Sequence, residues 1–325
     1  MTTVQYDVLG IGNAIVDILA ACDDAFLARQ GMAKGGMMLI DEDQASTLYA
    51  AMGSAVEASG GSAANTMAGI GSFGGKPAFI GKTCDDAFGK IFAHDLKSIG
   101  VSYTTPLATG GAATASCLIL VTPDAQRTMN THLGACANLG PDDIDQELVA
   151  ASAITYLEGY LFDPPKAKEA FRKAAKLAAE NGRKVALTLS DSFCVERYRD
   201  EFIEFIRNHV DILFANEAEI EALFEGLPLH EAANRLVKDV GISAITMSEK
   251  GSLLVSGDER IEIAAQPIAR LVDTTGAGDL YAAGVLYGLS RDLPLKECGR
   301  LGSIAAAEVI SHYGARPERA LRSLC

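Results

Sequence analysis

The chain has 325 residues and a formal net charge of −14, and 49% of its residues are hydrophobic. That length and apolar content are typical of a globular enzyme with a sizeable core and one or two domains. The acidic balance argues against a nucleic acid partner, because a polyanion needs clustered Lys and Arg. A small anionic substrate is still compatible, because the amides at a helix terminus act locally.

The seven cysteines are scattered through the chain, without a CxxC pair or a Cys/His cluster. This spacing disfavours a zinc site and a disulfide framework, so we expect reduced thiols in a cytoplasmic protein. The N-terminal stretch MTTVQYDVLG lacks the basic flank and apolar core of a signal peptide. No apolar run is long enough to cross a bilayer, so we expect no membrane partner.

Apolar runs and helical spacing predict the elements of the first part of the chain. We expect strands at 6–12 and 77–81, an extended stretch at 13–22, helices at 43–52 and 86–99, and a loop followed by an Ala-rich helix within 58–74. From residue 100 to about 139 the chain is richer in Thr, Gly and β-branched residues. Two runs there, ASCLILVTP and QRTMNTHL, predict a hairpin.

The second part of the chain alternates regularly between strands and helices. We expect strands at 153–159, 184–190, 210–216 and 243–249, helices at 165–180, 194–208, 217–223 and 229–239, then a short hairpin over 252–265 and two closing helices. Such alternation indicates βαβ units and a buried parallel sheet. We find no linker or repeat. We therefore expect one α/β domain over residues 1–325, with a small β lid from segments near 13–45 and 100–135.

Residues 273–279 read DTTGAGD and directly precede the helical stretch LYAAGVLYGLS. The first amides of a helix have no internal partner, and with the helix dipole they form an anion site. Gly276, Ala277 and Gly278 are small enough for a phosphate to approach the backbone. Asp279, in the same turn, can accept a proton from an attacking hydroxyl. The heptad thus predicts a phosphoryl-transfer site, and the plain alternative is a glycine loop with an acidic helix start.

Other polar residues follow expected strands, at the sheet edge where ligands bind. Asn13 and Asp17 share one face of an extended segment and can grip vicinal hydroxyls. In the run GGSAAN, Gly60 and Gly61 open the backbone to a ligand, and Ser62 and Asn65 supply hydrogen-bonding groups. Helix capping and surface polarity are the plain alternatives for both groups.

Two further strand ends carry candidate residues. Asn216 and Glu219 fit a magnesium site that acts through water, or simply a helix cap. A β-turn or a nucleotide contact explains the next group equally well: Thr246, Ser248, Lys250 and Gly251.

Two familiar phosphate motifs are excluded by their context. The GxGxxG string of Gly69, Gly71 and Gly74 lies at the end of the Ala-rich helix, whereas a dinucleotide fingerprint follows a strand and opens a helix. The string IGKT at 80–83 lacks the first glycine of a P-loop, because position 76 is Lys76.

Taken together, DTTGAGD, GGSAAN and NEAE resemble the signatures of the PfkB, or ribokinase-like, family of carbohydrate and nucleoside kinases, in the same order along the chain. The resemblance implies a ribokinase-like three-layer α/β sandwich with a mostly parallel central sheet and a small β lid. It also implies ATP-dependent transfer of a phosphoryl group to a primary hydroxyl, with Mg²⁺ as cofactor.

The resemblance assigns roles to the candidate residues. Asp279 is expected as the base, with the amides of Gly276, Ala277 and Gly278 as the anion hole. The acceptor's hydroxyls would be held by Asn13, Asp17, Gly60, Gly61, Ser62 and Asn65. The nucleotide would contact Asn216, Thr246, Ser248, Lys250, Gly251 and Thr274. Asn216 and Glu219 would organise Mg²⁺, and Asp273 and Thr275 resemble positions that bind a monovalent cation such as K⁺ in some members.

Within the family, GNAIVDI and GGSAANT are more similar to adenosine kinases. Apolar lid residues would suit a flat purine, and an aromatic ring could stack on it: Met37, Leu39, Leu118 and Leu133 for the lid, Phe162 for the ring. We therefore expect a small-molecule partner, adenosine, giving AMP and ADP. Two alternatives stay open: a kinase of ribose, fructose or a related ketose, and a non-catalytic nucleoside-binding protein. A monomer and a homodimer are both compatible with the sequence.

Overall fold

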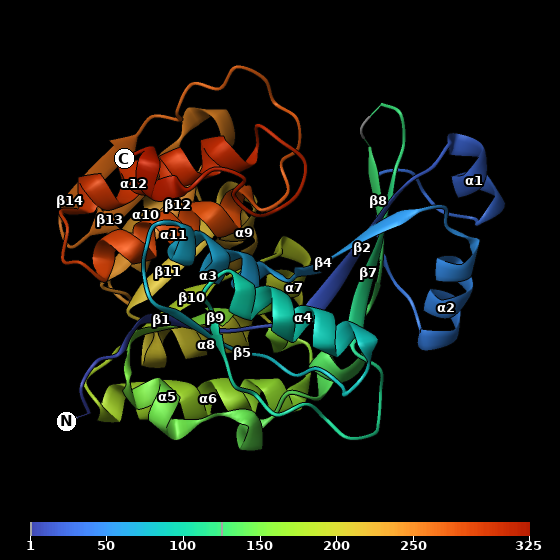
Figure 1. Cartoon of the computed structure of the whole chain (residues 1–325). Helices are drawn as coiled ribbons and strands as arrows, with labels where there is room; N and C mark the ends of the chain where they lie inside the picture. Colours follow the sequence, from blue (N-terminus) through green and yellow to red (C-terminus); the bar gives the residue numbers. More distant parts are fainter. Residues whose placement is uncertain (1, 125) are drawn as a thin grey trace.

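The computed structural model describes residues 2–124 and 126–325. A large sheet and a small sheet form the two parts of the molecule, and the small sheet projects from the main body beside helices α1 and α2 (Figure 1). The large sheet has nine strands in the order β14-β13-β12-β11-β10-β9-β1-β5-β6. Its strands are β1 (Tyr6–Ile11), β5 (Pro77–Ile80), β6 (Ser102–Tyr103), β9 (Ser152–Glu158), β10 (Lys184–Thr188), β11 (Ile212–Asn216), β12 (Ile242–Thr246), β13 (Ser252–Ser256) and β14 (Glu259–Ile263).

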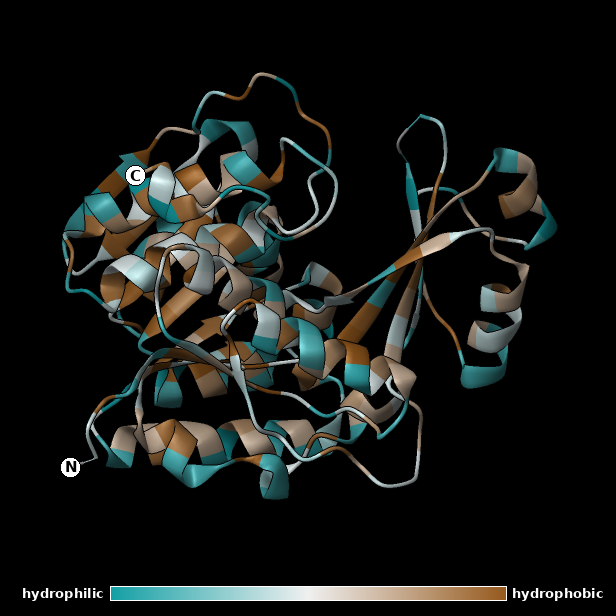
Figure 2. Cartoon of the chain, viewed as in Figure 1, coloured by the Kyte–Doolittle hydropathy of each residue, from teal (hydrophilic) through white to brown (hydrophobic). Residues whose placement is uncertain are grey.

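All neighbouring strands from β6 to β12 pair in parallel, and only β13 and β14 are antiparallel. Buried parallel strands read as continuous apolar runs, as in the segments YDVLGI and ILFAN. Brown, apolar ribbon accordingly runs along the strands in the middle of the main body (Figure 2). The expected α/β class with a mostly parallel sheet is confirmed.

Helices cover both faces of the large sheet and complete three layers. One core cluster lies under α5 (Gln146–Ala150), α6 (Pro165–Glu180), α7 (Ser192–Arg197), α8 (Arg199–His209), α9 (Glu217–Phe224) and α10 (Leu229–Leu236). The other lies under α3 (Ser62–Ser72), α4 (Ala87–Ser98), α11 (Ala277–Leu289) and α12 (Leu295–Val309). Helix α6 shows why such helices form, because its buried residues recur at helical spacing on one face.

The small sheet has five strands in the order β3-β8-β7-β2-β4. These are β2 (Ile15–Ala21), β3 (Met37–Leu39), β4 (Ala55–Gly60), β7 (Ala115–Val121) and β8 (Arg127–His132), and one face is covered by α1 (Asp24–Arg29) and α2 (Glu42–Ala51). We call this sheet with its two helices the lid. The expected hairpin is present as β7 and β8.

Three segments differ from the expectation. β4 lies outside the two segments expected for the lid, and β6 lies inside the second one but pairs with the large sheet. The single helix expected over 194–208 is divided at Tyr198 into α7 and α8. In the part of the chain that the structure describes, no helix is long and apolar enough to cross a membrane.

Candidate active site

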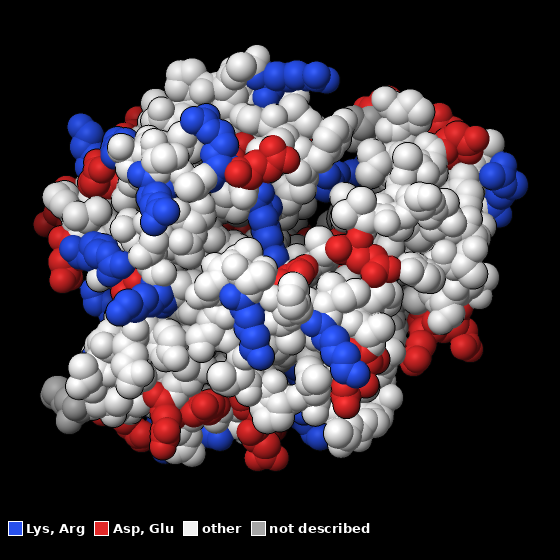
Figure 3. Space-filling view, viewed as in Figure 1, with Lys and Arg blue, Asp and Glu red and all other residues white. Residues whose placement is uncertain are grey.

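A cavity of about 720 Å³ lies between the large sheet and the lid. The space-filling view shows the molecule hollowed between these two parts, with acidic and basic side chains mixed over the visible face (Figure 3). The cavity is lined by most of the residues expected from the sequence: Asn13, Asp17, Gly61, Ser62, Asn216, Glu219, Thr246, Thr274, Thr275, Gly276, Ala277, Gly278 and Asp279.

The position of the cavity follows from the strand order. From β1 the chain first adds β5 and β6 on one side, and then adds β9 to β12 on the other. Ligands of open α/β sheets bind outside the carboxyl ends of the strands at such a reversal point. Asn13 follows β1, and Glu158 ends the neighbouring β9. The two side chains meet there, with 2.7 Å between Asn13 Nδ2 and Glu158 Oε1.

Asp279 lies in the first turn of α11, as expected. Its carboxylate is held from α3, where Ser62 Oγ donates to Oδ1 over 2.6 Å and Asn65 Nδ2 donates to Oδ2 over 3.1 Å. Burial raises the pKa of Asp279, while these two hydrogen bonds lower it. Ser62 and Asn65 were expected to bind substrate, and here both orient the candidate base. A fixed carboxylate at this place can accept a proton from a hydroxyl in the cavity.

The start of α11 supplies backbone donors beside Asp279. Gly276 is the N-cap residue, with a left-handed φ of 78°, and a Cβ there would lie 2.8 Å from Ala315 Cα. The N–H of Ala277 donates to the carbonyl of Thr274 over 3.2 Å. Among the described residues, the N–H groups of Gly276 and Gly278 have no backbone acceptor outside the helix. Two of the three expected amides are therefore available to an anion.

A buried carboxylate organises the floor of the cavity. Glu158 is 1% exposed and accepts hydrogen bonds from the Asn13 side chain, the Asn13 N–H and the Ala63 N–H. Burial raises the pKa of Glu158 to about 7, against these hydrogen bonds, which lower it. The N-cap of α3, Gly61, must be glycine, because its φ is 93° and a Cβ would lie 2.2 Å from the Asn13 carbonyl oxygen. Asn13 and the start of α3 are thus fixed together.

Asp17 projects from lid strand β2 into the cavity. Burial raises the pKa of its carboxyl to about 6, Arg316 and Arg127 lower it, and Asp279 raises it. The backbone of Gly60 lies against this carboxylate: a Cβ at Gly60 would be 2.3 Å from Asp17 Oδ2. Gly60 therefore makes room for the carboxylate instead of lining the cavity.

Asn216 and Glu219 form a capping box at the start of α9, which was the plain reading of this motif. Glu219 accepts the N–H of Asn216 over 3.0 Å and its side-chain amide over 2.8 Å. Burial raises the pKa of Glu219 to about 7, against the backbone hydrogen bond from Asn216. Both residues also line the cavity, so the cap and a contact with metal-bound water are compatible.

Three nucleotide candidates lie outside the cavity: Ser248, Lys250 and Gly251. Lys250 pairs with Glu217 at 3.3 Å in an exposed ion pair. Gly251 has a φ of 97°, and a Cβ there would lie 2.0 Å from the Ile263 carbonyl oxygen, so the turn itself requires this glycine. Their nucleotide role stays a prediction.

The expected cation position is occupied by groups of the chain itself. Asp273 is 8% exposed, and its Oδ1 accepts the N–H and hydroxyl of Thr275 over 3.0 and 2.7 Å. Its Oδ2 accepts the Gly314 N–H over 2.9 Å and forms an ion pair with Arg127. Arg127 Nη1 also donates to Thr275 Oγ1 over 2.8 Å. A lid guanidinium therefore lies beside the start of α11, and K⁺ binding by Asp273 and Thr275 stays a prediction.

The lid wall is apolar, as expected, although one residue was assigned to the wrong face. Along β7, Cys117 and Ile119 line the cavity, whereas Leu118 is 1% exposed and packs in the core on the opposite face. Side chains alternate along a strand, so neighbours cannot share a face. The remaining candidates, Met37, Leu39 and Leu133, do line the cavity.

The stacking role expected for Phe162 is wrong. Phe162 is 1% exposed and stacks on Phe202 in the core below α8, with ring centroids 3.9 Å apart. Tyr160, two residues earlier, is 39% exposed and lines the cavity. The turn Gly159–Phe162 directs alternate aromatic rings to opposite sides.

The sequence reasoning missed Glu158, Arg127 and Arg316. A carboxylate ending the apolar strand AITYLE was a usable signal, because such a position at the sheet edge is unfavourable without a partner. The two arginines reach the site from segments distant in sequence, and no local pattern marks them.

Comparison with known proteins is consistent with this geometry. The family model of the pfkB family carbohydrate kinases matches residues 37–320, so the chain belongs to that family of phosphotransferases. The adenosine kinase of Sinorhizobium meliloti has 52% sequence identity and a TM-score of 0.91, over 98% of each chain. A probable sugar kinase of Rhizobium etli has 48% identity and a TM-score of 0.92, over 100% of this chain and 98% of that one. The adenosine kinase of Saccharomyces cerevisiae is 25% identical over 94% of each chain.

The protein is thus an adenosine kinase-like member of the family, with a sugar or nucleoside as its small-molecule partner. Family membership also implies ATP as the donor, and generally Mg²⁺. The available amides of Gly276 and Gly278 fit the terminal phosphates of ATP. Oxygen donors at Asn216 and Glu219 fit a hydrated Mg²⁺, which keeps several waters and few protein ligands.

Proposed function

We propose that the protein transfers the γ-phosphoryl group of ATP to the 5′-hydroxyl of adenosine, giving AMP and ADP. One observation carries the proposal: Asp279 and the available amides of Gly276 and Gly278 open into the same cavity as Asn13 and Asp17. An acceptor hydroxyl held by Asn13 and Asp17 then lies between a base and an anion site. Phosphoryl transfer needs mostly such positioning and charge neutralisation.

In this mechanism, Asp279 accepts the proton of the 5′-hydroxyl as its oxygen attacks phosphorus. Ser62 and Asn65 keep the carboxylate aligned. The amides of Gly276 and Gly278, with the dipole of α11, stabilise the negative charge on the transferring group. Mg²⁺, when bound near Asn216 and Glu219, supplies further charge neutralisation on the phosphates. Arg127 places a fixed positive charge beside the same turn.

The purine is favoured as acceptor by the walls of the cavity. Ile119, Met129 and Leu133 supply apolar surface from the lid, and Tyr160 supplies an aromatic ring from the main body. A free pentose is polar on both faces and gains little from such a wall, whereas a purine buries a flat apolar face. The lid also keeps bulk water from the acceptor, which limits wasteful hydrolysis of ATP.

A sugar kinase is the second candidate, because three polar side chains line the cavity: Asn13, Asp17 and Glu158. They would serve the hydroxyls of a free sugar equally well. The two candidates differ in whether the acceptor also contacts the apolar residues of the cavity wall.

A coupled assay of ADP release tests the proposal with ATP, with and without Mg²⁺, across nucleosides, pentoses and ketoses. We expect adenosine to give the highest kcat/KM, and no turnover without Mg²⁺. A ketose or ribose preferred over adenosine would establish the sugar kinase. Ligand binding without ADP release for any acceptor would establish a non-catalytic binding protein.

A further inference from the structure

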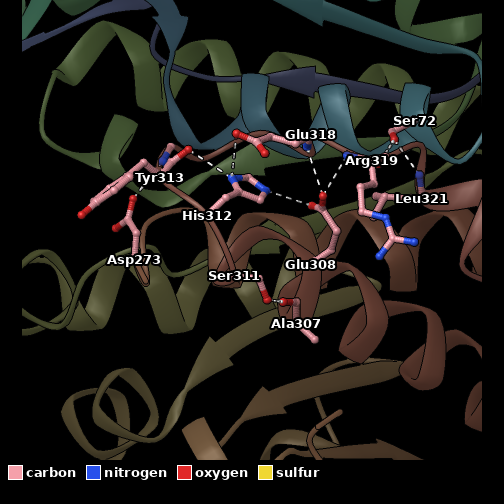
Figure 4. Close-up of polar contacts among 11 residues, drawn as sticks. Ser72, Asp273, Ala307, Glu308, Ser311, His312, Tyr313, Glu318, Arg319 and Leu321 are labelled. Carbon is pink, nitrogen blue, oxygen red and sulfur yellow. Dashed lines mark hydrogen bonds and ion pairs between the residues drawn. The ribbon is translucent and has the colours of Figure 1, made fainter. Parts of the chain in front are cut away.

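The loop that follows α12 carries an arginine, Arg316, that contacts the residue next to the candidate base. The backbone of this loop is fastened by other residues (Figure 4). Glu308 Oε1 accepts the N–H groups of Glu318 and Arg319 over 3.1 and 2.8 Å, and its Oε2 lies 3.2 Å from His312 Nε2. Ser72 Oγ accepts the Leu321 N–H over 2.9 Å. The backbone of the loop is therefore held at several points that do not involve the side chain of Arg316.

The guanidinium of Arg316 joins lid strand β4 to helix α3. Its Nη1 donates to Ser59 Oγ on lid strand β4 over 2.5 Å, and its Nε donates to Asn65 Oδ1 on α3 over 3.3 Å. Its Nη2 is buried and has no hydrogen-bond partner among the described residues. The side chain is thus directed into the structure, where a guanidinium with an unsatisfied N–H group costs stability.

The contact with Asn65 determines which way that carboxamide is turned. Because Asn65 Oδ1 accepts from Arg316, its NH₂ group must face the other way, toward Asp279. Without the arginine, the carboxamide could turn and present its oxygen to the carboxylate, which would repel it. Arg316 therefore acts on the candidate base through one intermediate side chain.

The charge of Arg316 acts on a second carboxylate. Arg316 lies near Asp17, because it donates to Ser59, and Ser59 pairs in the lid sheet with Val16, the residue before Asp17. The other charged or titratable groups near Asp17 are Arg127 from β8, Asp279 from α11 and Cys117 from β7. Burial is the largest influence on the pKa of Asp17 and raises it, and Arg316 is the largest of the influences that lower it. Removing this arginine leaves Arg127 as the remaining cation among those neighbours.

We propose that Arg316 is a positioning residue for phosphoryl transfer: it orients Asp279 through Asn65 and places a positive charge near Asp17, which receives the hydroxyls of the acceptor. The inference rests on the proposed function, because both carboxylates have their roles there. Arg316 has two properties with separate effects, its fork of hydrogen bonds and its positive charge. The fork of hydrogen bonds serves the base, and hence kcat, whereas the positive charge serves acceptor binding, and hence KM.

Two substitutions separate these properties. Arg316→Lys keeps the charge but loses the fork, because one ammonium nitrogen replaces the two guanidinium nitrogens that contact Ser59 and Asn65. We expect kcat to fall about tenfold, with the acceptor KM within about threefold of the wild type. Arg316→Gln removes the charge. We expect its acceptor KM to rise at least about tenfold, and the pH below which KM increases to move upward.

Ser72→Ala is the matched control, because it removes a fastening of the same loop that touches neither Arg316 nor the cavity. It should lower Tm slightly and leave kcat, KM and the pH profile unchanged. If the Arg316 variants behave like this control, with lower Tm and wild-type kinetics, the inference is wrong.

A third variant covers the case in which neither Arg316 variant folds. Ser59→Ala removes only the acceptor of Arg316 Nη1, so kcat should fall about threefold, and an unchanged kcat contradicts the inference. The wild type is assayed in parallel. A wild type without turnover contradicts the proposed function and the inference with it, whereas an active wild type with unaffected variants contradicts the inference alone.

Discussion

Replacing Asp279 by Asn tests the base without disturbing its surroundings. Ser62 can rotate its hydroxyl to accept from the new amide group, while Asn65 continues to donate to the remaining oxygen. The fold should therefore be retained. Because a general base contributes about 10²–10⁴ in rate, we expect kcat to fall at least about a hundredfold, which is about 3 kcal/mol or more of barrier.

The same substitution has a defined effect on stability. Burial holds the pKa of Asp279 above that of an unfolded aspartate, so ionisation costs stability at every pH above the unfolded value. An amide lacks this cost. Asp279→Asn should unfold at the same or a higher temperature than the wild type at pH 8, and the difference should shrink as the pH falls toward 4.

The assay is ADP release under saturating ATP and adenosine, with thermal unfolding recorded at pH 8 and pH 4. Turnover within about tenfold of the wild type would refute the role of Asp279. A large loss of both turnover and Tm would also count against the reasoning, because it would show that the variant fails by unfolding.

One further substitution and two pairs of substitutions give separate checks. Asp17→Asn should raise the acceptor KM at least about a hundredfold and abolish the fall of kcat/KM below pH 6. Since the pKa of Asp17 is about 6 when folded and about 3.9 when unfolded, it should also stabilise the chain at pH 8 by at most about 3 kcal/mol, and not at pH 4. Gly276→Ala should lower Tm, because the φ of Gly276 is 78°. A Cβ at Gly278 meets no atom within 4 Å, so Gly278→Ala should raise the KM for ATP and leave Tm unchanged. Phe162→Ala should cost about 3–5 kcal/mol of stability, whereas Tyr160→Ala should leave Tm unchanged and raise the adenosine KM.

Each of the two pairs contains its own control. Urea unfolding and steady-state kinetics on all five variants separate stability from binding. Asp17→Asn that destabilises the chain at pH 8 would contradict the electrostatic argument. Equal kinetic effects of the two glycine substitutions would show that the phosphate path was misplaced. A normal adenosine KM in Tyr160→Ala would remove the main aromatic support for a purine.

Much of the site could be predicted because its signals are local. The heptad before α11, the capping box of α9 and the glycines before α3 each place a helix start at the end of a strand or loop. Amides at such starts face outward whatever the rest of the fold does. The alternation of strands and helices then implies that these starts meet at one edge of the sheet.

What could not be predicted depends on contacts between distant segments. Arg316 is 251 residues from Asn65 in the chain, and Arg127 is 148 from Thr275. β4 was read as loop at Ser59 and Gly60, because a lid strand that ends in glycine lacks the usual apolar alternation. The error at Leu118 has a similar cause, since the face of a strand that meets the cavity is set by its sheet partners.

The central claim is that a carboxylate and unpaired helix amides meet the acceptor hydroxyl at one point. A crystal structure with adenosine and a non-hydrolysable ATP analogue tests it most directly. The account predicts the 5′-oxygen within hydrogen-bonding distance of Asp279, with the γ-phosphate on the amides of Gly276 and Gly278. A triphosphate bound elsewhere, or a 5′-oxygen directed away from Asp279, would contradict it.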